Sequence, residues 1–186
     1  MNATEHKKTI YGRDVLEFVT VAIEYCAFLE KSQGRPKSDF TGTMLKLLPL
    51  LYVKAQLLPK VETDGTFLPN GKVTEDDYNY ILRTVYDIMG NADQYLDVSY
   101  EDEMETDETQ WKSVSEHLAD IYQSVRNFLA VYQDGVEECM ADALWAVQES
   151  FETYWGTAVV DALKRLHKIH YSASSDEEDD TTPYYD

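Results

Sequence analysis

WKSVSEHLADIYQSVRNFLAVYQDG, residues 111–135, carries the clearest structural signal in the chain. Its apolar residues recur at alternating steps of three and four, the spacing of a helix that packs along a seam against a second helix. These residues are Trp111, Val114, Leu118, Ile121, Val125, Phe128 and Tyr132. Asp134 and Gly135 then form a tight turn, and a turn this short joins antiparallel neighbours. The chain is therefore predicted to end in a long antiparallel helix hairpin.

The second helix of this hairpin is predicted to run over residues 136–169. Its inward-facing residues are predicted to be Val136, Met140, Ala143, Val147, Phe151, Tyr154, Ala158, Ala162, Leu166 and Ile169. Gly156 is a flaw in this helix, because a glycine inside a helix costs about 1 kcal/mol relative to alanine. Close packing against a neighbour, or a bend, would explain a glycine at this position.

Three more helices are predicted upstream, over residues 12–31, 38–58 and 74–89. The apolar face of the first contains Val15, Phe18, Val19, Ala22, Ile23, Cys26 and Leu29, which recur at helical spacing. The density of leucine in the second makes it the expected central helix of the bundle. Pro49 lies inside that helix, and because proline removes a backbone hydrogen bond we expect a kink there, or a break into two helices.

Residues 92–108 are the least regular part of the body, and they contain many acids and no base after Asp97. We interpret them as a solvated connection, in which Tyr95, Leu96 and Val98 form a short extended stretch, and we expect no strand pair. The predicted fold class is therefore all-α, a bundle of about five main helices that ends in the long antiparallel hairpin. Residues 1–172 are predicted to form this single domain, and residues 173–186 a disordered acidic tail.

The chain is strongly acidic, with 35 Asp and Glu against 16 Lys and Arg and a formal net charge of −19 over 186 residues. Such a surface repels nucleic-acid phosphates and anionic lipid headgroups, so direct binding to nucleic acid or to a membrane is not expected. A basic protein partner fits this charge better. Since no apolar run has the length of a signal peptide or a membrane span, the predicted location is the cytoplasm. Cys26 and Cys139 are interpreted as isolated, buried small residues in a reducing compartment.

Three stretches carry a resemblance to a known family. They are LLPLLYVKA at residues 47–55, LADIY at 118–122, and DALW at 142–145 leading through Phe151 to YWG at 154–156. Together they resemble a bacterial helical family catalogued as domain of unknown function 5063, over residues from about 15 to 171. The resemblance implies an all-α fold and a bacterial cytoplasmic setting. It implies no activity, and no functional residue can be carried over from it.

Four carboxylates on the last predicted helix, Glu138, Asp142, Glu149 and Glu152, share one stripe. Helical proteins that hold two metals use such carboxylates, but they combine them with Glu-x-x-His elements, which this chain lacks. We therefore interpret the stripe as a solvated face and expect no metal. Trp145 lies within it and suggests that another helix covers part of it. A covered carboxylate needs a hydrogen-bonding partner, for which Tyr25, Tyr52, Lys54 and Arg83 are candidates.

His167 and His170 lie three residues apart near the end of the last helix, among Lys164, Arg165 and Lys168. Such a pair could bind a metal, but the neighbouring cations oppose this. Positive charge near a helix C-terminus is favoured by the helix dipole, and this structural role is our interpretation.

The leading functional hypothesis is a non-enzymatic interaction or accessory module, because the surface is acidic and no catalytic or nucleotide-binding motif stands out. No cofactor is expected. A first alternative is a small-molecule binder or enzyme with a pocket between the second and last helices. The residues of that candidate pocket are Tyr52, Trp145, Glu149, Glu152 and Tyr154. A further alternative is an acidic mimic of nucleic acid that occupies a basic site.

Overall fold

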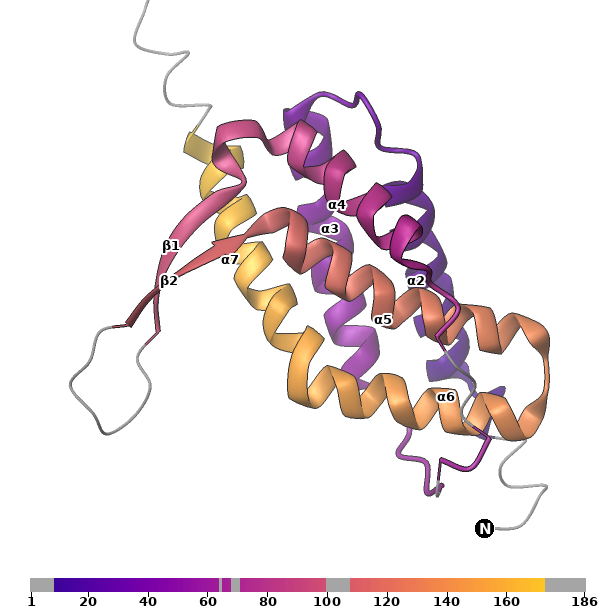
Figure 1. The fold of residues 1–186 in the computed structure, drawn as a ribbon. Coiled ribbons are helices and arrows are strands. Elements are labelled where there is room, and N and C mark those ends of the chain that lie inside the picture. Colours follow the sequence, from indigo (N-terminus) through magenta and orange to yellow (C-terminus); the bar gives the residue numbers. More distant parts are fainter. Residues whose placement is uncertain (1–8, 64, 68–70, 100–107, 173–186) are drawn as a thin grey trace, which may run out of the picture.

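Helices make up the body of the molecule, and a two-stranded hairpin projects from one side of it (Figure 1). The computed structural model describes residues 9–63, 65–67, 71–99 and 108–172. Its elements are α2 (Arg13–Glu30), α3 (Lys37–Gln56), α4 (Glu75–Met89), the 3-10 turn η1 (Gly90–Ala92), β1 (Gln94–Ser99), β2 (Glu108–Ser113), α5 (Val114–Asp134), α6 (Glu137–Ser150), the π-helical turn η2 (Phe151–Trp155) and α7 (Gly156–Ser172). The predicted all-α bundle that ends in an antiparallel helix hairpin is confirmed, since α5 packs against both α6 and α7.

Local sequence explains where α4 begins and where α5 ends. Thr74 starts α4 with a capping box, in which its hydroxyl accepts from the Asp77 backbone N–H at 3.1 Å and the Asp77 carboxylate accepts from the Thr74 N–H at 3.0 Å. Gly135 ends α5 in the left-handed conformation, with φ of 73°. Glycine adopts this conformation without steric cost, so it makes the tight turn into α6.

The central helix is α5, which contacts α2, α4, α6 and α7. The prediction that residues 38–58 form the central helix is wrong, because α3 packs chiefly against α2 and α7 and leaves one apolar stripe uncovered. In that stripe Leu50, Val53 and Leu57 each keep about half of their surface exposed. A high density of leucine does not reveal from the sequence which of the apolar faces other helices cover. The alternative of a break at Pro49 is also wrong, since α3 runs through it.

The prediction of a solvated connection without paired strands is wrong for the residues that flank 100–107. β1 and β2 pair in antiparallel register, with Leu96 opposite Trp111 and Tyr95 opposite Lys112. Trp111 therefore belongs to a strand and not to the helical seam. Ser113 marks the change, because its hydroxyl accepts from the Glu116 N–H at 3.1 Å and caps α5 at its first turn. The acids over residues 101–107 lie outside the described residues.

The last helix contains a π-helical turn, η2, which corrects one residue of the predicted inward face, whereas Ala158, Ala162 and Leu166 are buried as predicted. A π-helical turn contains more residues than an α-helical turn, so side chains within it are rotated relative to the α-helical expectation. Trp155 is consequently fully buried, whereas Tyr154, predicted to face inward, is 54% exposed. Gly156 is required by the same turn, because a β-carbon there would lie 2.5 Å from the Phe151 carbonyl oxygen. The glycine is therefore explained by the distortion of its own helix, and not by the expected packing against a neighbour.

Two further residues of the predicted faces lie at the surface. Ile23 of α2 and Val136 before α6 are 42% and 48% exposed. In α2 Tyr25, and not Ile23, points into the core. Tyr25 is fully buried and donates its hydroxyl to the Leu118 carbonyl at 2.9 Å. No described helix combines the length and the apolarity that crossing a membrane requires.

Candidate functional site

The five residues of the candidate pocket do not line the cavity described below. Tyr52 of α3 packs edge-on against Phe151, with ring centroids 5.0 Å apart. Glu149 and Glu152 are exposed, and Trp145 is 38% exposed. Tyr154 donates its hydroxyl to Asp120 Oδ2 at 2.6 Å and so points toward α5.

Asp142 corrects the interpretation of the carboxylate stripe as a solvated face. It is 2% exposed. Its carboxylate accepts hydrogen bonds from the Thr63 hydroxyl and, at 2.6 Å, from the Phe67 backbone N–H. These partners come from the segment between α3 and α4, not from the four residues expected to serve. Asp142 therefore fastens that segment onto α6.

The histidine pair also has a structural setting. His170 Nδ1 lies 2.8 Å from the Thr41 hydroxyl of α3, and the His167 ring packs on Tyr171. Among the described residues no group of three or more His, Cys, Asp or Glu side chains is placed to hold a metal ion.

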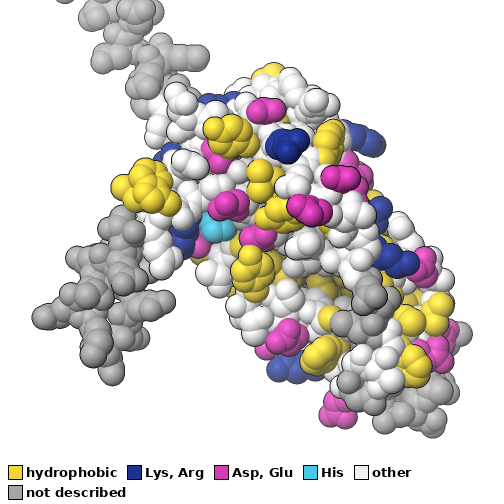
Figure 2. All heavy atoms as spheres, viewed as in Figure 1, with side chains coloured by type: hydrophobic (Ala, Val, Ile, Leu, Met, Phe, Trp, Pro, Cys, Tyr) yellow, Lys and Arg dark blue, Asp and Glu magenta, His cyan; other side chains and the backbone are white. Residues whose placement is uncertain are grey.

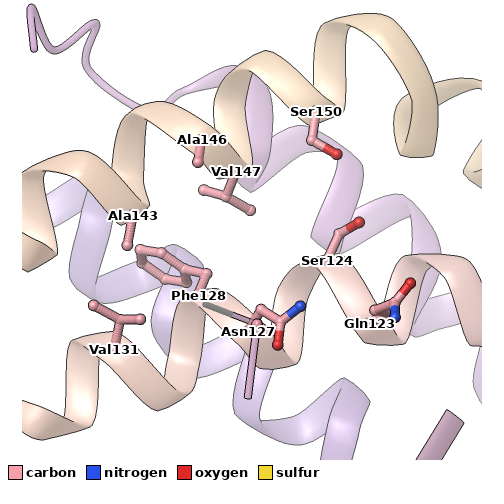
Figure 3. A pocket seen from close by; sticks show the side chains of 10 residues that line it. Gln123, Ser124, Asn127, Phe128, Val131, Ala143, Ala146, Val147 and Ser150 are labelled. Carbon is pink, nitrogen blue, oxygen red and sulfur yellow. The ribbon is translucent and has the colours of Figure 1, made fainter. Parts of the chain in front are cut away.

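A half-open cavity of about 270 Å³ lies between α5 and α6 (Figure 3). Gln123, Ser124, Asn127, Phe128 and Val131 line it from α5, Ala143, Ala146, Val147 and Ser150 line it from α6, and Gly71 closes one side. Asn127 is held in place because its Oδ1 accepts the Lys72 and Val73 backbone N–H groups at 2.7 and 2.8 Å. Sequence reasoning missed this cavity, since no chemistry-bearing motif marks it.

The inner face of the β-hairpin is fastened to α7 by ion pairs. Lys112 of β2 lies between two carboxylates, with its Nζ 2.9 Å from Asp97 Oδ2 and 2.8 Å from Asp161 Oδ2. Lys164 binds the other oxygen of Asp97 at 3.0 Å. Hydrogen bonds from Lys112 and Lys164 hold the pKa of Asp97 below its usual range. Arg165 adds two hydrogen bonds to the Ala92 carbonyl, at 3.2 and 3.0 Å.

Tyrosines make polar contacts to α5, one of them from the hairpin and two from other elements. Tyr95 reaches His117 Nε2 of α5 at 3.0 Å, and Tyr78 donates to Asp120 Oδ1 at 2.8 Å. Burial raises the pKa of Tyr95 to about 12, and the hydrogen bond to Asp120 together with burial raises that of Tyr154 to about 12. These phenols therefore stay protonated at neutral pH and act as donors. These tyrosines hold neighbouring elements together by hydrogen bonds, and neither Tyr95 nor Tyr154 has a pKa low enough to act as a base.

The outer face of the hairpin is apolar and open. Leu96 and Trp111 are opposite each other in the strand register and are 54% and 70% exposed. Figure 2 shows a large apolar side chain on the outer edge of the molecule where β1 and β2 lie. Sequence reasoning placed Trp111 in the core, and the alternation of Tyr95 and Asp97 with Leu96 was the signal for a two-faced strand.

Comparison with known proteins identifies relatives but no activity. A family model described as domain of unknown function (DUF5063) matches residues 9–172. The crystal structure of protein BF1032 from Bacteroides fragilis is similar over 88% of this chain and 96% of that chain, with 41% sequence identity and a TM-score of 0.79. No curated protein matches the chain. With a family model that covers most of the chain and a structural relative of this identity, the protein belongs to the family of domain of unknown function 5063.

Proposed function

We propose that this protein is a non-enzymatic interaction module whose β-hairpin binds a protein partner through Trp111 and Leu96. The observation that carries the proposal is the exposure of this cross-strand pair, 70% and 54%, on a projecting element. Tryptophan is enriched among the residues that dominate binding energy, and here it lies beside a second exposed apolar side chain.

The anchoring of the opposite face supports this role. Lys112 joins Asp97 to Asp161, so the hairpin is held against α7 before any partner arrives. Binding to a pre-organised surface loses less conformational entropy than binding to a loop that must order itself. The ion pairs of the inner face thus present the apolar outer face in a defined orientation.

Charge indicates the chemistry of the partner. Residues 101–108, which contain the connection between the strands, include six acids and no base, and the whole chain carries a formal net charge of −19. A basic partner with an apolar slot for Trp111 is complementary to the exposed tryptophan and to the net charge of the chain. We place the module in a bacterial cytoplasm, because Cys26 and Cys139 are both free thiols, as in a reducing compartment.

The test places a photo-crosslinking amino acid at position 111 of the full chain in its native host. We expect one specific protein adduct, and none from the same amino acid at Tyr86, which is 50% exposed on α4. The purified partner should then bind Trp111→Ala about tenfold or more weakly than the wild type, the loss that a central tryptophan causes. It should bind Tyr86→Ala normally.

Salt supplies a second readout, since pairing between an acidic and a basic surface weakens as ions screen it. Equal binding of wild type and Trp111→Ala would contradict the proposal. So would an adduct pattern at position 111 that matches the one at position 86.

A further inference from the structure

The cavity between α5 and α6 lies where α6 presents small side chains to α5. Ala143, Ala146 and Ser150 lie on α6 and Ser124 lies opposite on α5 (Figure 3). Deeper in the seam Phe128 and Val147, 2% and 3% exposed, form an apolar floor. A closed apolar cavity of about 150 Å³ holds one benzene ring, so about 270 Å³ is room for a ring with a substituent.

The polar groups of the cavity are uncharged and placed on its rim. Two backbone N–H groups bind Asn127 Oδ1, which fixes the orientation of its amide. The Asn127 nitrogen lies on the side of the amide that faces the cavity, where it can donate to an acceptor (Figure 3). Ser124 and Ser150 offer hydroxyls from the two helices. None of the described lining residues carries a charge.

We propose that this cavity binds a small uncharged molecule that combines a flat apolar ring with a carboxamide-like group. The ring would lie on Phe128 and Val147, and its carbonyl oxygen would accept from the Asn127 amide. A carboxamide nitrogen would donate to the Ser124 or Ser150 hydroxyl. An anion is disfavoured, because the lining offers no cation and the chain is strongly negative. The site is independent of the hairpin surface.

Benzamide and benzoate are the matched probes, since they share a ring and differ in charge. Titration of each into the ¹⁵N-labelled full chain is followed by NMR. We expect benzamide to cause saturable shifts at the backbone amides of Ser124, Asn127 and Ala146, and benzoate to bind at least about tenfold more weakly, as expected for an ion without a partner. Absence of saturable benzamide shifts at these amides would overturn the proposal, as would equal binding of benzoate.

Variants assign the binding to the cavity. Ala146→Leu fills it and should abolish the benzamide shifts. Asn127→Asp keeps the acceptor for the Lys72 and Val73 N–H groups but removes the donor, and it should weaken benzamide binding about three- to tenfold or more. Benzamide affinity unchanged in both variants would overturn the proposal. If Ala146→Leu fails to fold, Asn127→Asp alone is the test. The binding of the hairpin's partner should be unaffected by either variant.

Discussion

Asp142 shows how one buried carboxylate can hold a connecting segment. Its two oxygens accept hydrogen bonds from Thr63 and from the Phe67 backbone N–H. Asp142→Ala would leave both donors without an acceptor, and we expect a loss of about 1–3 kcal/mol in the free energy of unfolding. Urea denaturation measures this loss.

The control for Asp142 is Glu149, an exposed carboxylate on the same helix. Glu149→Ala should change the free energy of unfolding by less than about 0.5 kcal/mol. Similar losses for the two variants would mean that Asp142 does not hold the segment.

His117 predicts a dependence of stability on pH. Burial lowers its pKa, although Asp161, Asp120 and Glu116 act in the opposite direction; Lys112 acts with burial. The unfolded chain takes up a proton near the ordinary histidine pKa of about 6.5, whereas the folded chain resists until a lower pH. In that window the unfolded state binds more protons, so stability is full above it and falls as the pH drops through it.

His117→Gln should therefore flatten the decline in Tm between about pH 7.5 and pH 5.5, since glutamine does not titrate. His167→Gln is the matched control, because His167 is exposed and lies on the last turns of α7. Thermal melts followed by circular dichroism measure both. A slope that is unchanged in His117→Gln would contradict the assigned direction.

Lys112 connects both strands of the hairpin to α7, because it pairs with Asp97 of β1 and with Asp161. Lys112→Met would leave Asp161 without its ion-pair partner on the hairpin and remove one of the two lysines from Asp97. These side chains are largely buried, so the loss should exceed that of an exposed pair, at about 1 kcal/mol or more. Hydrogen exchange of the β1 and β2 amides should then accelerate about fivefold or more.

Lys54→Met is the matched control for this element. Lys54 pairs with Glu17 between α3 and α2, and it lies in a different part of the bundle. It should leave exchange in the hairpin unchanged. Equal exchange in the hairpins of wild type and Lys112→Met would show that other contacts hold it.

The π-helical turn gives a prediction with an inverted sign. In a regular helix, alanine in place of glycine stabilises by about 1 kcal/mol. At position 156 the added β-carbon would lie 2.5 Å from the Phe151 carbonyl oxygen and 3.1 Å from its ring. Gly156→Ala should therefore destabilise by about 1–3 kcal/mol, as overpacked positions do. A rise in Tm for this variant would mean that the last helix is regular through residues 151–155.

At the scale of the whole chain, we predict that the acidic tail, residues 173–186, does not contribute to stability. These residues lie outside both the described residues and the family match. Asp176 to Asp180 are five consecutive acids, and Lys164, Arg165 and Lys168 are the nearest bases before them. Exposed ion pairs contribute only about 0–1 kcal/mol each, less than the cost of about 1–2 kcal/mol for ordering each residue. Deletion after Ser172 should leave Tm unchanged, and a fall of many degrees would show that the tail docks.

Helical periodicity was enough to predict most of the bundle. Val125 and Phe128 lie in the α5 seam as expected, with 0% and 2% exposure, and Gly135 makes the expected turn. Such features follow from sequence because a helix repeats its faces every 3.6 residues and because glycine accepts a positive φ. Both causes act within a few residues of chain.

The candidate sites depended on contacts between distant residues. Trp111 continued the helical period without a miss, yet Ser113 begins the helix after it and the strand pairs with Leu96 across an intervening segment. Asp142 fits the pattern of a solvated stripe in the sequence, but in the structure Phe67, 75 residues away in sequence, binds it and covers it. Neither the strand at Trp111 nor the burial of Asp142 has a local cause, so the periodic pattern of the sequence could not predict them.

The sequence of residues 114–135 by itself determines the helix, its buried face and the turn that ends it, because hydrogen bonding and side-chain spacing within a helix are local. The outward face of the hairpin, the π-helical turn at Phe151–Trp155 and the cavity beside Asn127 arise only when the elements pack. Packing sets them because each depends on which surfaces other helices cover and which are left open. Contacts between residues far apart in the sequence decide which surfaces are covered, and such contacts leave no periodic pattern along the chain.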